Sequence, residues 1–451
     1  MTDKQREWTV MIYMAGDNNL SEECVYSLTQ IKESLKDIPE LSVIAQFDPS
    51  GVRAETKRYD LTHAHTLTKD AESTGWKALE TNTGEPLNLL DFIRWGISDY
   101  KAARYMVVLV GHGSGTDDDF LLRDENPPDS LSILELRDVF ETITRDGNRI
   151  DILGMDTCLM SMAEVCYELK RTNLTYLVGS EGFSPNTGWP YATIIAKLTA
   201  KILLGGATPK WLAELITEEY KNFYVPYING GISVDQSVLE IGKIDPVSDA
   251  VRDLVDKLRA EIKANELDYL KPKQNALLLA HWETQSYNGE VFVDLYDFCD
   301  RLELRYKLIP DSGEVPAACR AVKRAIGDLV TKGCYAGAAF QFSFGVSIYF
   351  PWAFQSPTYS NLSFPKETHW LDFLKDYHDV TRRKPPRCRD VRDTGRASVP
   401  TNKGRDGRVE SMRNPSNAEC VQCYEFTTET VKSRKRPASK PPKGTKRAKT
   451  G

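Results

Sequence analysis

The chain has 451 residues, of which 41 % are hydrophobic, 10 % aromatic and 27 % charged, and its formal net charge is −6. A chain of this length and composition can bury a substantial core, whereas its longest apolar run, Trp8–Met14, is far shorter than the roughly 20 residues of a membrane-spanning helix. The nine cysteines follow no regular spacing, which argues against a disulfide framework; without an export signal, this predicts a cytoplasmic protein with no membrane association.

The net charge hides two parts of opposite sign. Residues 381–451 hold 20 Lys and Arg against 7 Asp and Glu, a balance of +13, which leaves 38 against 57, a balance of −19, for residues 1–380. The basic part is rich in Pro, Lys, Arg, Ser and Thr, so it cannot bury enough apolar surface to offset its chain entropy. We therefore expect an acidic globular part followed by a disordered tail over residues 379–451.

Strands and helices alternate through the first 200 residues. The predicted strands are apolar runs at Trp8–Met14, Leu41–Phe47, Arg104–Val110, Ile150–Met155 and Leu174–Gly179, with a short edge strand at Lys57–Leu61. The predicted helices between them are Leu20–Leu35, Leu87–Tyr100, Leu131–Thr144 and Met160–Lys170. This alternation predicts an α/β three-layer sandwich, in which helices cover both faces of a mostly parallel central sheet.

Beyond residue 200 the pattern is less regular. We expect helices at Trp211–Tyr224, Val247–Ala264, Val291–Leu302, Val315–Leu329 and Trp370–Tyr377, and strands at Val238–Ile244, Ala276–Ala280 and Gly345–Pro351. The chain is accordingly divided into a core that carries the site over residues 8–200, a C-terminal α+β portion over 201–378, and the tail over 379–451.

Two strand ends carry reactive side chains. Arg104–Val110 runs directly into Gly111 and His112, and Ile150–Met155 runs into Asp156, Thr157 and Cys158. Because the carboxyl ends of neighbouring parallel strands meet at one edge of a sheet, we expect this imidazole and thiol to share a rim. A thiol that gives its proton to an imidazole attacks carbonyl carbons, and a helix beginning at Leu159 would favour the thiolate. This constellation predicts a cysteine peptidase dyad.

Further residues complete the predicted site. The backbone N–H of Gly113 pairs with that of Cys158 as an oxyanion-binding site. Asp156 is of a residue type that commonly caps a helix, and it could cap the helix that follows. The loop after Leu174–Gly179 lies where a pocket wall belongs, which makes Glu181, Asn186 and Trp189 substrate-binding candidates. Asp17–Asn19 is expected to be only a turn and a helix cap.

These motifs resemble the clostripain family of cysteine peptidases, which have the caspase–haemoglobinase fold. The likeness spans about residues 8–378. It includes the N-terminal segment Trp8–Leu20, the loop Glu181–Tyr191 and the C-terminal segments Tyr359–Phe364 and Trp370–Leu374. By this resemblance His112 is the catalytic histidine, Cys158 the nucleophile and Asp156 the acid that recognises a basic side chain. The resemblance implies an endopeptidase that cuts protein or peptide substrates after Arg or Lys.

Two properties of family members bear on this chain. Several cut themselves in the linker between the His and Cys strands, where Arg123 is the candidate residue for self-cleavage. Some depend on calcium, for which the acidic run Asp117–Asp119 is the candidate, but the run lacks the alternating ligands and glycine of a known calcium loop. We therefore expect no cofactor, with calcium at Asp117–Asp119 as the alternative, and no metal site at Cys420 and Cys423, whose pair lacks further ligands.

Other functions stay open at this point. A catalytically silent protein with this fold would act as a binding module through its basic tail, whose cluster Lys432–Lys449 suits nuclear import or nucleic-acid binding. Ligation or transamidation on the same dyad is a second enzymatic alternative. The sequence favours a hydrolase, because both His112 and Cys158 are present. We also expect a monomer.

Overall fold

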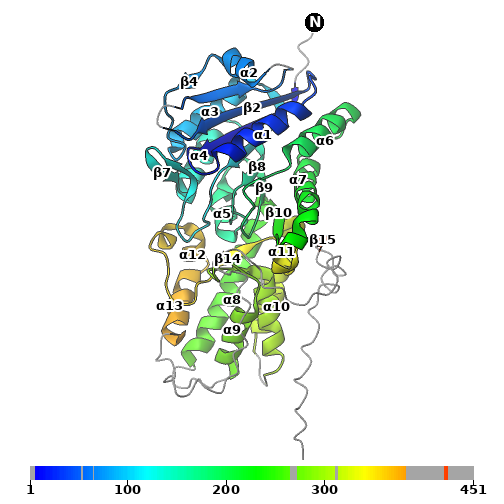
Figure 1. Cartoon of the computed structure of the whole chain (residues 1–451). Helices are drawn as coiled ribbons and strands as arrows, with labels where there is room; N and C mark the ends of the chain where they lie inside the picture. Colours follow the sequence, from blue (N-terminus) through cyan, green and yellow to red (C-terminus); the bar gives the residue numbers. More distant parts are fainter. Residues whose placement is uncertain are drawn as a thin grey trace, which may run out of the picture.

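The computed structural model describes residues 6–51, 54–63, 66–264, 272–309, 313–381 and 421–424. The molecule is elongated, with the large sheet and its flanking helices toward one end (Figure 1). Four later helices gather at the other end: α8 (Ile244–Ala264), α9 (Pro272–Glu283), α10 (Leu295–Tyr306) and α13 (Trp370–Thr381).

A ten-stranded sheet runs through the molecule in the order β15-β13-β10-β9-β8-β5-β1-β2-β3-β4. Its centre is parallel and consists of β2 (Leu41–Pro49), β1 (Arg6–Gly16), β5 (Ala102–Val110), β8 (Ile150–Asp156) and β9 (Leu174–Gly179). Antiparallel strands extend both sides: β3 (Thr56–Asp60) and β4 (Lys77–Ala78) on one, and β10 (Val234–Glu240), β13 (Val330–Ala336) and β15 (Val421–Tyr424) on the other. The predicted α/β fold with a mostly parallel sheet is confirmed.

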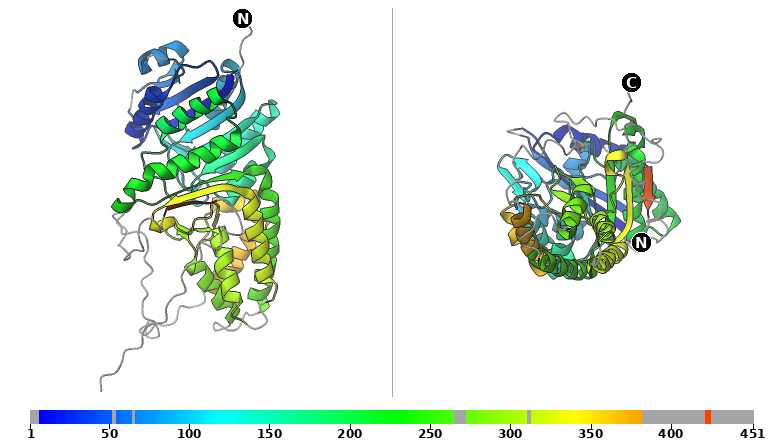
Figure 2. Two further views of the ribbon diagram at one scale, coloured as in Figure 1. Left: turned by 90° about the vertical axis from the view of Figure 1, so that its right-hand side faces the viewer. Right: turned by 90° about the horizontal axis from the view of Figure 1, so that it is seen from below.

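Alternate side chains of the central strands enter two separate cores. In β1, Val10 and Ile12 pack into one core, while Met11 and Tyr13 pack into the other. The first core is closed by α1 (Ser21–Ser34), α6 (Tyr191–Leu204) and α7 (Pro209–Tyr224), of which α6 and α7 cross one face of the sheet in Figure 2. The second core is closed by α3 (Pro86–Asp99), α4 (Ile133–Arg145), α5 (Ala163–Glu168), α8 and α11 (Val315–Leu329). This two-sided burial explains why the strands read as continuous apolar runs.

Smaller elements complete the fold. A hairpin of β6 (Leu121–Glu125) and β7 (Pro128–Leu131) follows β5, and a second sheet joins β11 (Ser286–Tyr287), β12 (Phe292–Asp294) and β14 (Ser347–Tyr349). The remaining helices are α2 (Leu67–Thr74) and α12 (Ser363–Glu367).

Four predicted elements differ from the structure. The expected strand Val238–Ile244 ends at Glu240, and Ile241–Lys243 forms a 3-10 helix. The expected strand Ala276–Ala280 is part of helix α9, and the expected helix Val291–Leu302 begins with strand β12. The helix predicted from Met160 begins only at Ala163. Short apolar segments carry no periodicity that separates helix from strand, so long-range pairing decides between them.

The far edge of the sheet holds a covalent feature that the sequence did not predict. Cys334 in β13 is disulfide-bonded, and Cys423 in β15 stands opposite it in the backbone register. The argument against disulfide bonding is therefore wrong at this position, whereas Cys166, Cys299 and Cys319 are buried and free.

Strand β15 belongs to the predicted tail, whose remaining residues from 382 onward, including Lys432–Lys449, lie outside the described part of the chain. Within the described ranges, every helix is too short or too polar to cross a bilayer.

Candidate active site

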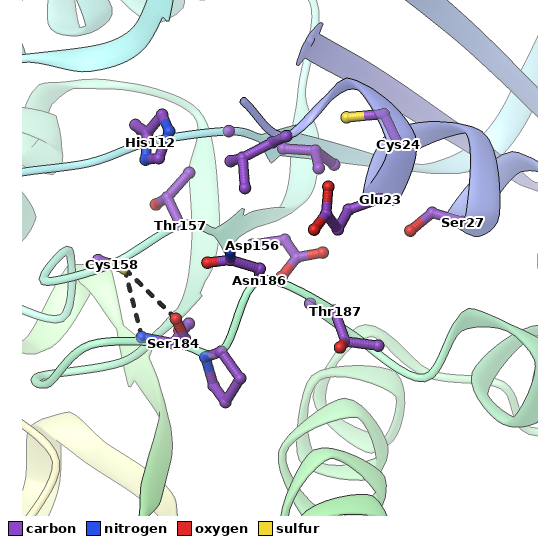
Figure 3. Close-up of a pocket in the computed structure, with 15 residues that line it drawn as sticks. Glu23, Cys24, Ser27, His112, Asp156, Thr157, Cys158, Ser184, Asn186 and Thr187 are labelled. Atoms are coloured by element: carbon purple, nitrogen blue, oxygen red, sulfur yellow. Dashed lines mark hydrogen bonds between the residues drawn. The ribbon is translucent and has the colours of Figure 1, made fainter. Parts of the chain in front are cut away.

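The adjacency of β5 and β8 brings the two predicted reactive residues to one rim. The strands are parallel neighbours, with Val110 opposite Asp156 in the register. His112 follows β5 and Cys158 follows β8, and both line one pocket together with Asp156 (Figure 3). The geometry that the strand ends predicted is therefore present.

Cys158 does not open a helix. Leu159 has a left-handed backbone with φ of 64°, and Met162 has an extended backbone that forms a bridge with Ser347, so residues 159–162 are not helical and α5 begins only at Ala163. The prediction that a helix N-terminus favours the thiolate is wrong, because the backbone of Ser161 pairs instead with Ser180 and Ser347.

The Cys158 thiol is held by the backbone of Ser184. The Ser184 N–H donates to Sγ at 3.3 Å, and the thiol faces the Ser184 carbonyl at 3.7 Å (Figure 3). Burial, together with the negative charges of Asp156 and Asp235, raises the pKa of Cys158 to about 11, against a lowering by the Ser184 N–H. The resting group is a protonated thiol, which needs a base before it can attack.

His112 is positioned by Asn19, which follows β1. Its Nε2 lies 2.7 Å from Asn19 Oδ1. An amide oxygen can only accept, so Nε2 carries the proton and Nδ1 remains the basic nitrogen. Partial burial and the nearby Arg123 lower the pKa of His112, which keeps its imidazole neutral and able to accept a proton near pH 7.

Asn19 was expected to serve only a turn or a helix cap. Leu20 occupies the N-cap of α1 without a side-chain hydrogen bond, and the turn is stabilised by Asn18, whose Oδ1 accepts from Leu20 N at 2.9 Å. The signal that would have identified Asn19 is its place at the carboxyl end of β1, the strand beside β5.

Gly113 packs against the nucleophile's backbone. A Cβ at this position would lie 2.6 Å from the Cys158 carbonyl oxygen, so only glycine fits. Among the described residues, the N–H groups of Gly113 and Cys158 have no acceptor, which leaves both free to donate to a substrate oxygen.

Asp156 ends β8 and is 6 % exposed. Its Oδ2 accepts from Trp189 N at 3.1 Å and from the Tyr191 hydroxyl at 2.8 Å, while Oδ1 has no partner among the described residues. Gly188 lies so close that a Cβ there would be 2.7 Å from Oδ2. Burial raises the pKa of Asp156 to about 6, so the carboxylate is ionised but incompletely satisfied near pH 7.

The pocket has a second acidic residue that sequence reasoning did not single out. Glu23, in the first turn of α1, lines it beside Asp156, and the predicted Asn186 lies exposed on the opposite loop (Figure 3). Glu22 and Glu23 stand together in the first turn of α1, where acidic residues are common in any helix. Only the packing of α1 over the ends of β1 and β8 gives Glu23 its place.

Two other predicted pocket residues point elsewhere. Glu181 is fully buried behind the loop, where its Oε1 accepts from Gly345 N at 2.7 Å. Trp189 is 3 % exposed and packs in the core against Gly154, so it contributes its backbone N–H rather than its ring. The predictions of Glu181 and of the Trp189 side chain as pocket walls are therefore wrong, because both side chains turn inward from the loop.

The self-cleavage candidate is not in an irregular loop. Arg123 has an exposed side chain, but it lies within β6, and its carbonyl accepts from Asn18 Nδ2 at 2.7 Å. The next residue, Asp124, is buried and accepts from Thr83. Cleavage after Arg123 would require this hairpin to open.

Two members of the acidic run after His112 accept hydrogen bonds from distant segments. Asp117 accepts from the Tyr349 hydroxyl, and Asp119 accepts from Ile133 N. In the described part of the chain, three side chains that can ligate a metal converge at a different place, which does not include Asp117–Asp119.

Known proteins resemble this chain in sequence and in fold. A sequence model of the clostripain family matches residues 12–377. Clostripain of Hathewaya histolytica is 25 % identical over 361 residues, a match that covers 66 % of this chain and 66 % of the relative, so the chain spans just under two thirds of that protein.

Two solved structures share the fold. An inactive zymogen C11 protease of Parabacteroides distasonis is 20 % identical, with 84 % of this chain and 99 % of that chain covered at a TM-score of 0.55. A secreted C11 cysteine protease of Bacteroides thetaiotaomicron, solved with an irreversible peptide inhibitor, is 18 % identical, with 81 % and 99 % covered at a TM-score of 0.58.

Proposed function

The chain belongs to the clostripain family of cysteine peptidases, and from this premise we propose that it hydrolyses peptide bonds after arginine or lysine through a thioester on Cys158. The observation that carries the specificity is the carboxylate of Asp156, buried in the same pocket that Cys158 and His112 line. An ionised group with an open acceptor in a pocket calls for a cationic partner.

The first step is the activation of the thiol. Because the pKa of Cys158 is raised to about 11 and that of His112 is lowered, the resting pair is thiol and neutral imidazole. His112 therefore acts as the general base when substrate arrives, and Asn19 keeps Nδ1 as its accepting atom. The hydrogen bond between the thiol and Ser184 is exchanged for one to the imidazole in this step.

The second step is the collapse of the tetrahedral intermediate. The N–H groups of Gly113 and Cys158 stabilise its oxyanion. The imidazolium of His112 then protonates the leaving amine, which leaves the acyl group on Cys158 Sγ. Water, deprotonated by His112, hydrolyses the thioester and regenerates the thiol.

Two carboxylates support basic specificity. Asp156 Oδ1 has no partner within the described residues and is available to a guanidinium or ammonium group. Glu23 adds a second negative charge to the pocket wall. Arginine would pair with such groups through its planar fork, and lysine as a point charge.

The test is hydrolysis of an arginyl reporter peptide by the full-length chain. We expect Cys158→Ala to abolish turnover, with Cys166→Ala, another free cysteine, as the control that retains it. Turnover by the Cys158→Ala variant would overturn the nucleophile assignment. A positional peptide library then separates basic specificity from cysteine peptidase activity in general, and product mass spectrometry separates hydrolysis from ligation.

A self-processing step is better placed at Arg145 than at Arg123. Both lie between the strands that carry His112 and Cys158, and both side chains are exposed. Arg123, however, lies in the middle of β6 and is followed by buried Asp124, whereas Arg145 lies in the last turn of α4 and is followed by exposed Asp146 and Gly147. Incubation of the wild-type chain should generate a new N-terminus at Asp146 that the Cys158→Ala variant lacks. A wild-type chain that stays intact while hydrolysing the reporter would refute this step alone.

A further inference from the structure

Two carboxyl groups meet in the interior of the protein, outside the substrate pocket. Glu181 belongs to the loop between β9 and α6 (residues 180–190, the β9–α6 loop), and Asp294 ends β12. Both side chains are fully buried and contact each other. Consecutive backbone N–H groups hold them together, since Gly345 N donates to Glu181 Oε1 at 2.7 Å and Phe344 N donates to Asp294 Oδ2 at 2.5 Å.

The remaining oxygen of Glu181 indicates that a proton lies between the two groups. Its Oε2 is buried and has no donor among the described residues, while both oxygens of Asp294 already accept from the backbone, Oδ1 from Asp297 N at 2.6 Å. Two ionised carboxylates in contact repel each other strongly inside a protein, so one of the pair keeps a proton and donates it to the other. Burial, followed by the charges of Asp294 and Asp235, raises the pKa of Glu181 well above its ordinary value, in agreement with this arrangement.

The groups around the pair supply no counter-charge. Asp235 in β10 raises the pKa of Glu181, and Asp297 in α10 raises that of Asp294. Asp297 is itself paired with Arg301 at 3.2 Å. In the described part of the chain, no lysine, arginine or histidine forms an ion pair with Glu181 or Asp294. Burial raises the pKa of the other titratable neighbours, which are therefore neutral near pH 7: Tyr287 in β11, and Tyr296 and Cys299 in α10.

The β9–α6 loop joins the pair to the nucleophile. The residue after Glu181 is Gly182, whose carbonyl accepts from Leu159 N at 3.1 Å. Two residues further on, the Ser184 N–H donates to Cys158 Sγ at 3.3 Å (Figure 3). The position of Glu181 therefore determines where the segment that holds the reactive thiol begins.

We propose that Glu181 and Asp294 are a positioning pair, which shares one proton and holds the β9–α6 loop in the arrangement that presents Cys158 for attack. Loss of this proton at alkaline pH would leave two ionised carboxylates in contact, and their repulsion would release Glu181 from Gly345 and shift the loop that carries Ser184. Neither side chain lines the substrate pocket. The pair therefore acts through the loop, and its effect on turnover rests on the proposed function.

The kinetic test compares variants of the full-length chain on the arginyl reporter between about pH 6 and 10. Glu181→Gln replaces the shared proton by an amide hydrogen that does not titrate, so it should retain most of the activity near pH 7. Its kcat/KM relative to the wild type should rise roughly threefold or more toward pH 10, because only the wild type loses the proton. Glu181→Met keeps the volume without the hydrogen bonds, and it should lower kcat about tenfold with little change in KM. A Glu181→Gln ratio that does not change with pH would overturn the shared proton.

Glu164→Gln is the matched control. Glu164 is also fully buried, but it accepts from Tyr349 N and the Tyr359 hydroxyl, which lie outside the β9–α6 loop. Its alkaline profile should follow that of the wild type. An equal alkaline gain in Glu164→Gln and Glu181→Gln would show a general effect of buried carboxyl groups and would contradict the positioning role.

A measurement without turnover separates the pair from the proposed function. In the Cys158→Ala background, the melting temperature is recorded against pH with and without Glu181→Gln. The folded pair binds one proton more than the unfolded chain above about pH 5, so its contribution to stability is present at low pH and declines as the pH rises, until the folded pair loses its proton. The chain with Glu181 should therefore lose roughly 1–3 °C per pH unit relative to Glu181→Gln over this range.

A difference in melting temperature that stays constant with pH would overturn the pair even if the reporter is cleaved. The expected slope in a chain that cleaves no reporter would support the shared proton and refute only the proposed function.

Discussion

Two buried carboxylates, Asp156 and Asp235, lie near the nucleophile Cys158, and they differ in the groups that they contact. In the pocket, Asp156 has one oxygen satisfied by Trp189 and Tyr191 and the other without a partner among the described residues. Behind the loop, Asp235 accepts from Glu181 N and Gly182 N at 2.7 and 2.9 Å.

Burial raises the pKa of both Asp156 and Asp235 above the ordinary value. A raised pKa beside a reactive thiol therefore does not by itself identify a functional group. What distinguishes Asp156 is an acceptor that opens to a cavity.

The interior carboxylate, Asp235, should affect folding most. Asp235→Ala leaves two buried N–H groups without an acceptor, and each costs roughly 1–3 kcal/mol. We expect the free energy of unfolding to fall by about 3 kcal/mol, measured by urea denaturation. Asp235→Asn keeps an acceptor oxygen and should lose less. If the alanine variant loses less than about 0.5 kcal/mol of unfolding free energy, the distinction between the interior and the pocket carboxylate no longer holds.

The pocket carboxylate, Asp156, should affect specificity rather than folding. Asp156→Asn keeps an acceptor for Trp189 N and Tyr191 but loses the charge. Because a hydrogen bond to a charged group contributes roughly 1.5–3 kcal/mol, kcat/KM for an arginyl reporter should fall about 100-fold. Unfolding should change by less than about 1 kcal/mol. The matched measurement is a reporter with a neutral residue before the scissile bond, and an equal loss on both reporters would show that Asp156 only supports the loop.

The pH dependence separates the same two roles. Asp156 has a pKa of about 6, so it loses its charge as the pH falls through that value. The preference for arginyl over neutral reporters, as a ratio of kcat/KM values, should therefore fall up to tenfold per pH unit below about 6. Protonation of His112 affects both reporters and cancels in the ratio. In Asp156→Asn the ratio should not change with pH.

The raised pKa of Asp156 changes folding stability with pH in the opposite direction to specificity. The pKa of Asp156 is higher in the folded chain than in the unfolded one, so the folded state binds more protons between about pH 4 and 6. Its contribution to stability is present at low pH and declines as the pH rises through this range. A wild-type chain whose stability, relative to Asp156→Asn, rises there would contradict the assigned shift.

The sequence predicted the central sheet and the two reactive residues well, for a physical reason. Strands buried on both faces are continuous apolar runs, and His112 and Cys158 follow two of them directly, so adjacency of the strands was enough to bring them together. The family resemblance added Asp156, which the sequence alone also allowed as a helix cap.

The rest of the site depends on contacts between distant segments. Glu181 turned inward because Gly345, 164 residues away, offers it an N–H. Leu159 adopts a left-handed backbone, and the strand-like course that follows pairs with Ser347, so no helical pattern at Met160 could be realised. Asn19 and Glu23 become site residues only through the packing of β1 and α1 beside β5 and β8. Local periodicity contains none of this information.

The smallest predicted effect concerns Glu23. It tests whether a carboxylate contributes to specificity because it lines the pocket. Glu23 lines the pocket from α1, whereas its neighbour Glu22 in the same helical turn is exposed and does not line it. Because Glu23 is partly solvated, its attraction for a bound cation is screened, and a contribution of about 0.5–1 kcal/mol is expected. Glu23→Gln should lower kcat/KM for the arginyl reporter roughly three- to fivefold, with neutral reporters unaffected.

Glu22→Gln is the matched control, since it removes the same charge from the same helix turn and should leave both reporters unchanged at moderate salt. If the two variants lose equally, the effect is the general negative potential of the domain and Glu23 has no place in the pocket. If only Glu23→Gln loses, and the loss disappears in the Asp156→Asn background, the two carboxylates act on one cationic side chain. That coupling is measured by a double-mutant cycle, and it distinguishes a pair that shares a substrate from two acids that merely lie near the same cavity.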